Sequence, residues 1–307
     1  MRITWRKAVG VAVACLILYF MIRSLRSGIA GLGSHEFVIS PLRIAGAFAT
    51  FAILFPVYGA IWKYLLGKFG YSLPYGKSLK VWLVSQAGRY VPGKVWFALG
   101  RIYLCEREGV PKAVTTVATG LELALVLASS IVVFGLVSAL TGSLRGQPYA
   151  WSVLLVPAIV AAVHPRVINR VVRLLRKGQG ELAIRYSDVL KMLAAYVGCW
   201  FIYGLGFYLV GTAVTVKAAG VAGGPAFGVE LLPQMIGINA LAWTVGFISV
   251  VTPAGLGVRE GVAFSLLSKV VDKPYPSLIP LAARVWVTIA EVAGIGIAAA
   301  LGGWKRR

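Results

Sequence analysis

Long apolar stretches separated by short basic connections recur along this chain, and they leave few classes of fold open. An α-helix rises ~1.5 Å per residue, so about 20 apolar residues cross a hydrocarbon core that is ~30 Å thick. Hydrophobic residues make up 59% of the sequence and charged residues 13%, with a mean hydropathy of +0.82. These values predict an all-α polytopic membrane protein rather than a soluble domain. The stretches interpreted as full spans are 7–22, 41–66, 112–140, 150–163, 188–216 and 277–301.

The excess of basic residues does not indicate nucleic-acid binding. The net charge is +21, but the Lys and Arg residues fall mainly between apolar stretches, where they set topology and attract anionic lipid headgroups. Cys15, Cys105, Cys199, His35 and His164 show no metal-ligand spacing. The sequence therefore predicts a membrane partner, no nucleic-acid partner, and neither a metal nor another cofactor. The first apolar stretch lacks good cleavage geometry and is interpreted as a retained helix.

The stretch SQAGRYVPGKVW at 85–96 interrupts an otherwise apolar region. Pro92 removes a backbone donor, Gly88 and Gly93 loosen the helix, and Arg89 and Lys94 place two cations at the break. The apolar pieces on either side, of about 10 and 14 residues, are too short to cross a hydrocarbon core. Irregular backbone at membrane depth persists only when it is buried in protein or lines a wet cavity. The pattern therefore predicts a re-entrant helical hairpin, and the alternative is an ordinary surface loop.

A second break, SVVTPAGLGVREG, follows the apolar segment 229–250. It contains Pro253, Gly255, Gly257, Arg259 and Glu260, and a half-length apolar segment comes after it. This composition repeats the combination of helix breakers and charge found in the first break. It predicts a second broken re-entrant hairpin.

The distribution of basic residues predicts the topology. With two re-entrant hairpins and six full spans, most of the 31 Lys and Arg residues lie in cytoplasmic segments, as the positive-inside rule requires. The first hairpin then enters from the cytoplasm and the second from outside. Arg145 and Lys217 are predicted outside, whereas Lys68, Arg173 and Arg307 are predicted in the cytoplasm. Both termini are predicted to be cytoplasmic, in a multi-pass protein of the plasma (inner) membrane.

The same scheme divides one membrane domain, 1–307, into two halves of opposite orientation, 1–140 and 150–303. Each half contains two spans, a broken hairpin and a further span. A short sequence trace supports an inverted repeat, because three identical pairs lie 169 positions apart: Pro111 and Pro280, Thr119 and Thr288, and Glu122 and Glu291. Inverted repeats with discontinuous helices are typical of secondary transporters, with the substrate at the repeat interface.

Ionisable residues at membrane depth cost roughly 2.5–3.5 kcal/mol each, so they normally face partners or a cavity. The residues predicted there are Arg89, Lys94, Arg259, Arg284, Glu122, Glu260 and Glu291. One interpretation is mutual neutralisation, which would hold the two hairpins together. The other is anion binding by the surplus arginines and the half-helix N-termini, which suits a lipid phosphate. In either case, Glu122 and Glu291 are predicted to occupy equivalent places, each within reach of an intramembrane arginine.

Aromatic residues also gather near the two breaks. Trp82, Trp96, Trp243 and Trp286 lie close to them in sequence, and Tyr90 lies within the first. Each of them, taken singly, is interpreted as an ordinary packing or interfacial aromatic residue.

GRYVPGK at 88–94 and TPAGLGVREG at 252–261 resemble, as a pair, the two characteristic stretches of the lysylphosphatidylglycerol synthase transmembrane-region family, also called flippase-like. The resemblance extends over nearly the whole chain. The best-known members fuse this region to a soluble aminoacyl-transferase domain and move the aminoacylated lipid between leaflets. This sequence ends at Arg307 without such a domain, so the resemblance implies lipid translocation and not aminoacyl transfer.

The expected function is therefore lipid transport without enzymatic activity. The expected ligand is an anionic phospholipid or a lipid-linked saccharide. The alternatives are a non-transporting lipid-binding partner of a lipid-modifying enzyme, and an integral-membrane lipid-modifying enzyme, which the scattered Glu residues disfavour. The predicted binding residues are Arg89, Tyr90, Pro92, Gly93, Lys94, Pro253, Gly255, Gly257, Arg259 and Glu260, with Glu122, Arg284 and Glu291 in support.

Overall fold

The computed structural model describes residues 37–91, 95–142, 184–216, 227–249 and 255–300, together with Arg166 and Arg170. The elements in chain order are β1 (Phe37–Ile39), α2 (Pro41–Lys68), α3 (Tyr75–Gln86), η1 (Ala87–Tyr90), α4 (Trp96–Glu106), α5 (Lys112–Thr141), α8 (Tyr186–Ala213), β2 (Val214–Val216), η3 (Val229–Leu231), α9 (Leu232–Ile248), α10 (Val258–Leu267) and α11 (Tyr275–Ala300). The predictions for 7–22, 150–163, Arg145, Arg173, Lys217 and Arg307, and for the motif residues Pro92, Gly93, Lys94 and Pro253, lie outside the described residues.

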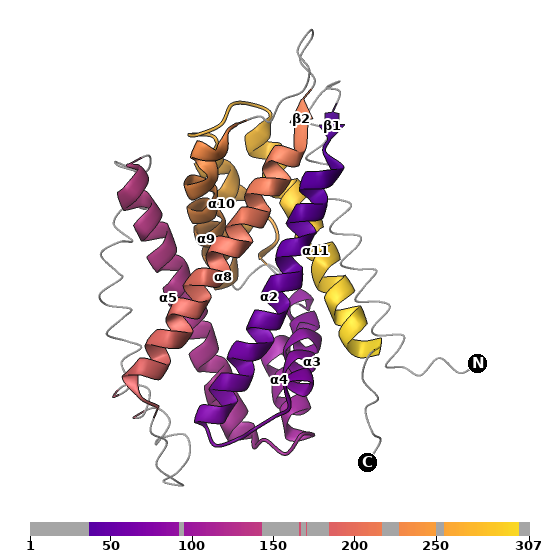
Figure 1. Ribbon diagram of the computed structural model, residues 1–307, viewed down its shortest axis with the longest axis vertical. Coiled ribbons are helices and arrows are strands. Elements are labelled where there is room, and N and C mark those ends of the chain that lie inside the picture. Colours follow the sequence, from indigo (N-terminus) through magenta and orange to yellow (C-terminus); the bar gives the residue numbers. More distant parts are fainter. Residues whose placement is uncertain are drawn as a thin grey trace, which may run out of the picture.

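Within this part of the chain, five helices are long and apolar enough to cross a membrane: Pro41–Lys68, Lys112–Thr141, Tyr186–Ala213, Val229–Ile248 and Tyr275–Ala300. Four of them coincide with predicted spans, and the helix at 229–248 was predicted as the first limb of the second broken hairpin. The prediction of a predominantly helical membrane protein with several apolar helices is confirmed, while the six spans and the re-entrant inverted repeat stay predictions. Figure 1 shows α2, α5, α8 and α11 running along the molecule.

Helices α2 and α8 pack side by side in opposite directions, and polar contacts tie them together at both ends. At one end Asp188 accepts a hydrogen bond from the Tyr64 hydroxyl at 2.7 Å and pairs with Lys68 Nζ at 2.8 Å. At the other end Arg43 Nη1 donates to the Thr212 carbonyl oxygen at 2.6 Å. The two helices therefore form a fixed antiparallel pair.

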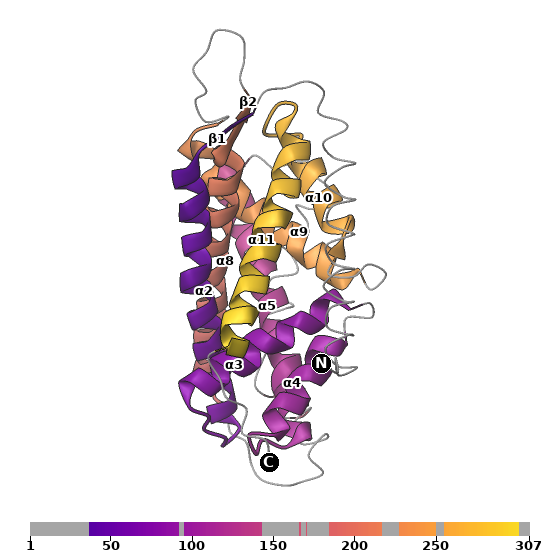
Figure 2. The same cartoon turned by 90° about the vertical axis from the view of Figure 1, so that its right-hand side faces the viewer.

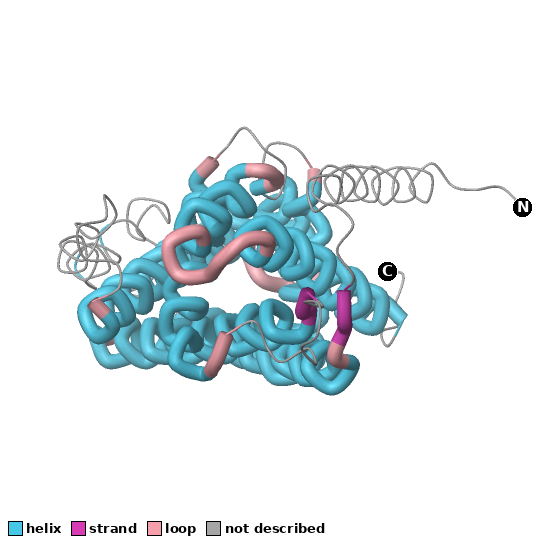
Figure 3. Tube along the Cα trace, turned by 90° about the horizontal axis from the view of Figure 1, so that it is seen from above, coloured by secondary structure: helices cyan, strands magenta, loops and turns pink. Residues whose placement is uncertain are grey.

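The sequence analysis did not anticipate the small antiparallel sheet beyond this pair. Strands β1 and β2 pair with Phe37 opposite Val216 and Ile39 opposite Val214, and Figure 3 shows them side by side at the rim of the bundle. The predicted helical span 188–216 is therefore too long by three residues, since Val214–Val216 form β2. Two of these residues are valines and Thr215 is also β-branched, and such side chains favour extended backbone once a partner strand is present.

The shorter helices form two pairs that occupy different ends of the molecule. Helices α3 and α4 lie in the lower half of Figures 1 and 2, and α9 and α10 lie in the upper half. Lys77 Nζ at the start of α3 lies 2.6 Å from Glu108 just after α4, so α3 and α4 form a closed hairpin. In this hairpin α3 continues into η1, and α4 starts again at Trp96.

Two glycines permit the close backbone contacts at the breaks. A Cβ on Gly88 would lie 2.5 Å from the carbonyl carbon of Trp96 and even closer to the backbone nitrogen of Phe97. Gly255 has φ +73°, and a Cβ there would lie 2.7 Å from the Gly246 carbonyl oxygen. Only glycine fits both the contact and the left-handed conformation at Gly255. The backbone on either side of each break is thereby drawn together.

Candidate functional site

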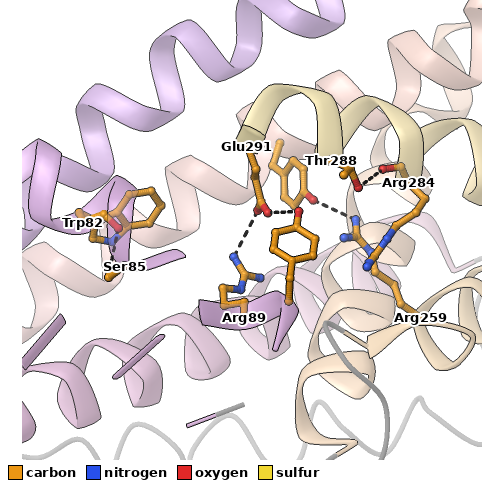
Figure 4. Close-up of polar contacts among 9 residues, drawn as sticks. Trp82, Ser85, Arg89, Arg259, Arg284, Thr288 and Glu291 are labelled. Atoms are coloured by element: carbon orange, nitrogen blue, oxygen red, sulfur yellow. Dashed lines mark hydrogen bonds and ion pairs between the residues drawn. The ribbon is translucent and has the colours of Figure 1, made fainter. Parts of the chain in front are cut away.

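The first break places two polar residues of η1 against α11. Arg89 Nη1 lies 3.3 Å from Glu291 Oε1, and the Tyr90 hydroxyl donates a hydrogen bond to Glu291 Oε2 (Figure 4). The Arg89 guanidinium also lies over the Trp243 ring of α9, 5.6 Å from its centroid. Glu291 therefore connects the break after α3 to the long helix α11. The Arg89 guanidinium has further N–H donors that do not contact Glu291.

The second break supplies Arg259 in the first turn of α10. Its Nη2 donates to the Tyr203 hydroxyl at 2.9 Å (Figure 4). The same nitrogen donates to Asn239 Oδ1 at 3.0 Å. No carboxylate among the described residues lies within ion-pair distance of Arg259. The two contacts come from neutral groups, so they orient the guanidinium without cancelling its charge.

Glu260, next in the chain, is engaged elsewhere. One carboxylate oxygen accepts a hydrogen bond from the Gly257 backbone N–H at 2.7 Å, which caps α10. The other lies 3.8 Å from Arg284 Nη1 on α11. Gly255 and Gly257 act through backbone conformation, with φ of +73° and +83°. Among the described residues of the second motif, Arg259 is thus the one whose side chain is available at the cavity between the two breaks.

Two neighbouring cavities lie at this junction. The first, which we call the arginine cavity, has a volume of about 30 Å³ and is lined by Arg89, Tyr90, Arg259, Arg284 and Glu291, among others. The second, the aromatic cavity, has a volume of about 80 Å³. Both are lined by Arg89, Phe97, Trp243, Phe247 and Glu291, so they share a wall. The structure brings together five of the residues predicted from sequence in the arginine cavity.

Glu122 lies away from the arginine cavity, in the wall of the aromatic cavity. It forms an ion pair with Arg101 of α4 and accepts a hydrogen bond from Trp82 Nε1 at 2.7 Å. Arg101 also donates to Ser85 Oγ at 3.1 Å and lies over the Trp62 ring, 4.6 Å from its centroid. Glu291 therefore contacts Arg89, one of the arginines predicted at membrane depth, whereas Glu122 contacts Arg101, which was not among them. The equivalence of the two Glu residues in a repeat stays a prediction.

Arg101 is the polar residue that the sequence analysis missed. The topology scheme placed it among the cytoplasmic basic residues, but 1% of its surface is exposed. A periodic pattern could have revealed it, because Phe97, Arg101, Leu104 and Cys105 are spaced to share one helical face, and all four are buried. The scheme assigned the residue by its place in the chain and overlooked this periodicity.

The aromatic residues near the breaks have different surroundings. Trp82 and Trp243 line the aromatic cavity, and Trp286 is buried against Phe51 with ring centroids 4.8 Å apart. Half of the Trp96 surface is exposed. Trp82 and Trp286 belong to the hydrophobic core and Trp243 packs against it, as the packing interpretation expects, while Trp82 and Trp243 in addition line the cavity.

Comparison with known proteins agrees with the sequence resemblance. No curated protein matches the chain. The model of one protein family, described as the lysylphosphatidylglycerol synthase TM region, matches residues 7–290, which is nearly the whole chain. The apolar helices, the two breaks and this match have one common explanation: the chain is a multi-pass membrane protein that belongs to the lysylphosphatidylglycerol synthase transmembrane-region family.

Proposed function

We propose that this protein binds the phosphate of an anionic lipid headgroup between Arg89 and Arg259 and moves that headgroup between leaflets. The observation that carries the proposal is the state of Arg259, whose guanidinium is held at the arginine cavity by Tyr203 and Asn239 and contacts no described carboxylate. Three arginines line this cavity with one carboxylate, Glu291, and an excess of positive charge at membrane depth is costly unless a ligand balances it. A lipid phosphate supplies the balancing negative charge and accepts several hydrogen bonds from guanidinium groups.

The arrangement of the short helices supports translocation. The pairs α3–α4 and α9–α10 lie at opposite ends of the molecule (Figure 2). Arg89 and Arg259, one beside each break, both line the arginine cavity. We interpret them as re-entrant hairpins that enter the plasma membrane from opposite faces, one in each half of an inverted repeat (1–140 and 150–303). A headgroup at their junction would be accessible in turn from either side, while its acyl chains remain in the bilayer.

The first test uses the full chain reconstituted in liposomes that contain a fluorescent anionic phospholipid. A membrane-impermeant quencher, added outside, reports the rate at which the lipid moves between leaflets. Arg89→Ala and Arg259→Ala should each lower the rate about tenfold or more, because each removes a charge-assisted hydrogen-bond donor. Arg89→Lys should be impaired less, since it keeps the charge but loses the planar fork. Arg107→Ala, at an exposed arginine that lines neither cavity, is the matched control.

Wild-type rates in the Arg89→Ala, Arg259→Ala double variant would refute the proposed mechanism and leave both arginines as clamps between helices. If the unaltered protein binds the phospholipid without moving it, the protein instead holds lipid for a partner enzyme. Turnover of the lipid into a new product would identify an integral-membrane enzyme.

The topology is tested by single cysteines introduced at Lys68, Arg145, Arg173, Lys217 and Arg307. With both termini in the cytoplasm, a membrane-impermeant thiol reagent applied to intact cells should label positions 145 and 217 only. The same reagent should label the other three positions after permeabilisation, which serves as the internal control. Labelling of position 173 in intact cells would contradict both the orientation and the opposed hairpins.

A further inference from the structure

The aromatic cavity is larger than the arginine cavity and has a different chemistry. Its walls include Tyr58, Trp82, Phe97 and Trp243, which present ring surfaces from α2, α3, α4 and α9. The Tyr58 and Trp82 rings stack with centroids 4.7 Å apart and an interplanar angle of 13°. Arg89 and Glu291 line both cavities, so the aromatic cavity lies directly beside the place proposed for the phosphate.

The charged groups in the wall of the aromatic cavity are already matched. Arg101 pairs with Glu122, and Arg89 pairs with Glu291. The guanidinium of Arg101 lies 5.9 Å from the Trp82 ring centroid, and that of Arg89 lies 5.6 Å from the Trp243 centroid. A cationic ligand would therefore meet two arginines, two neutralised carboxylates and aromatic rings that already interact with the protein's own cations. The wall disfavours a positively charged group.

Neutral hydrogen-bonding groups in the same wall are not matched. Gln86, at the end of α3, is 7% exposed and lines the aromatic cavity, and it has no hydrogen-bond partner among the described residues. The Tyr58 hydroxyl likewise has no partner in the described part of the chain. Both side chains line the open space of the cavity, where the donors and acceptors of a ligand could replace water as their partners. These two groups therefore suit a ligand that carries neutral donors and acceptors.

We propose that the aromatic cavity binds a neutral polyhydroxylated ring, a sugar or a cyclitol, that is attached to the phosphate held by Arg89 and Arg259. The apolar C–H faces of such a ring pack against aromatic side chains, while its hydroxyls pair with the Gln86 amide and the Tyr58 hydroxyl. The inference rests on the proposed function and narrows its ligand to phosphodiester-linked glycolipids, in preference to lipids with a cationic headgroup.

The test compares three water-soluble phosphodiesters by isothermal titration calorimetry on the full chain in detergent. Glycerophosphoinositol carries a neutral ring, glycerophosphoglycerol has the same charge without a ring, and glycerophosphocholine carries a cation. We expect glycerophosphoinositol to bind at least tenfold more tightly than either of the others. Free inositol should bind at least tenfold more weakly than glycerophosphoinositol, because the phosphate contributes contacts to both arginines. The comparison is extended to intact lipids by measuring the binding of phosphatidylinositol and of phosphatidylglycerol to the protein in nanodiscs.

Two variants assign the preference to the cavity. Gln86→Leu and Tyr58→Phe remove the unpaired groups at nearly constant volume, so each should reduce the preference for the ring several-fold and leave glycerophosphoglycerol binding unchanged. Gln234→Leu is the matched control, because Gln234 also has an unpaired buried oxygen but lines neither cavity. It should keep the full preference.

The outcomes separate this inference from the proposed function. Equal binding of the inositol and glycerol probes, or a preference for the choline probe, would overturn the ring subsite. Equal binding of free inositol and glycerophosphoinositol would show that the phosphate adds no affinity, and would overturn the attachment of the ring to the phosphate held by Arg89 and Arg259. If binding of the phosphodiester probes still depends on Arg89, the phosphate site remains supported without a ring subsite. Absence of any Arg89-dependent phosphodiester binding would instead overturn the proposed function and this inference together.

Discussion

Glu122→Leu is expected to lower the free energy of unfolding by about 3–5 kcal/mol, because it leaves the Arg101 guanidinium buried without its carboxylate. Arg101 is 1% exposed and Glu122 is 5% exposed, so water cannot replace the lost partner. The change also removes the acceptor of the Trp82 indole N–H. The loss would be measured as the shift of the unfolding midpoint of the full chain in mixed micelles.

Two controls show whether burial of the charge is the cause. The double variant Arg101→Met, Glu122→Leu removes both charges and should recover most of the lost stability, since apolar replacement of a whole buried pair is often neutral. Glu108→Leu breaks the partly exposed pair with Lys77 and should cost less than about 1 kcal/mol. A Glu122→Leu protein as stable as Glu108→Leu would contradict the structure at this pair.

Gly88→Ala is expected to reduce both stability and lipid translocation. The added Cβ would overlap the backbone of Trp96 and Phe97, and a helix backbone cannot yield as the end of a flexible side chain can. Overpacking of this kind typically costs about 1–3 kcal/mol, and moving η1 away from α4 would shift the adjacent Arg89 from Glu291 and the arginine cavity. We therefore expect a larger relative loss of translocation than of folded protein.

Gly100→Ala in α4 is the matched control, because nothing lies within 4 Å of the added Cβ. It should be neutral or stabilising by up to about 1 kcal/mol, as alanine favours helix more than glycine does. Both variants are compared by thermal unfolding and by translocation in liposomes at equal reconstitution. Wild-type activity in Gly88→Ala would show that the close approach of η1 to α4 is not needed to position Arg89.

The fold class and the positions of the two breaks could be predicted from the sequence because they depend on local properties. Length and hydropathy decide which stretches cross a hydrocarbon core, and proline, glycine and charge decide where a helix is interrupted. The same signals identified Arg89 and Arg259, since charge at membrane depth is costly wherever it occurs. These predictions need no knowledge of which helices are neighbours.

The pairing of the charges and the identity of the cavity walls were decided by tertiary structure. Sequence spacing could not show that Glu291 contacts Arg89, 202 positions away, or that Glu122 contacts Arg101. The sequence left mutual neutralisation and anion binding as alternatives. In the structure Arg89 has a carboxylate partner, whereas the hydrogen-bond partners of Arg259 are neutral, and anion binding stays a proposal. Ion pairs between distant helices depend on how the helices pack, and a local pattern carries no information on that packing.

Trp82 and Gln86 show the same division between sequence and structure. Each lies on an apolar helix whose sequence is compatible with ordinary packing, and only the meeting of α2, α3, α4 and α9 leaves a cavity that both side chains face. The sequence by itself determined a membrane protein with two charged helix breaks, since hydropathy and backbone chemistry act locally. Which charges remain available to a ligand, and which aromatic rings surround it, depended on the tertiary contacts between helices that are distant in sequence.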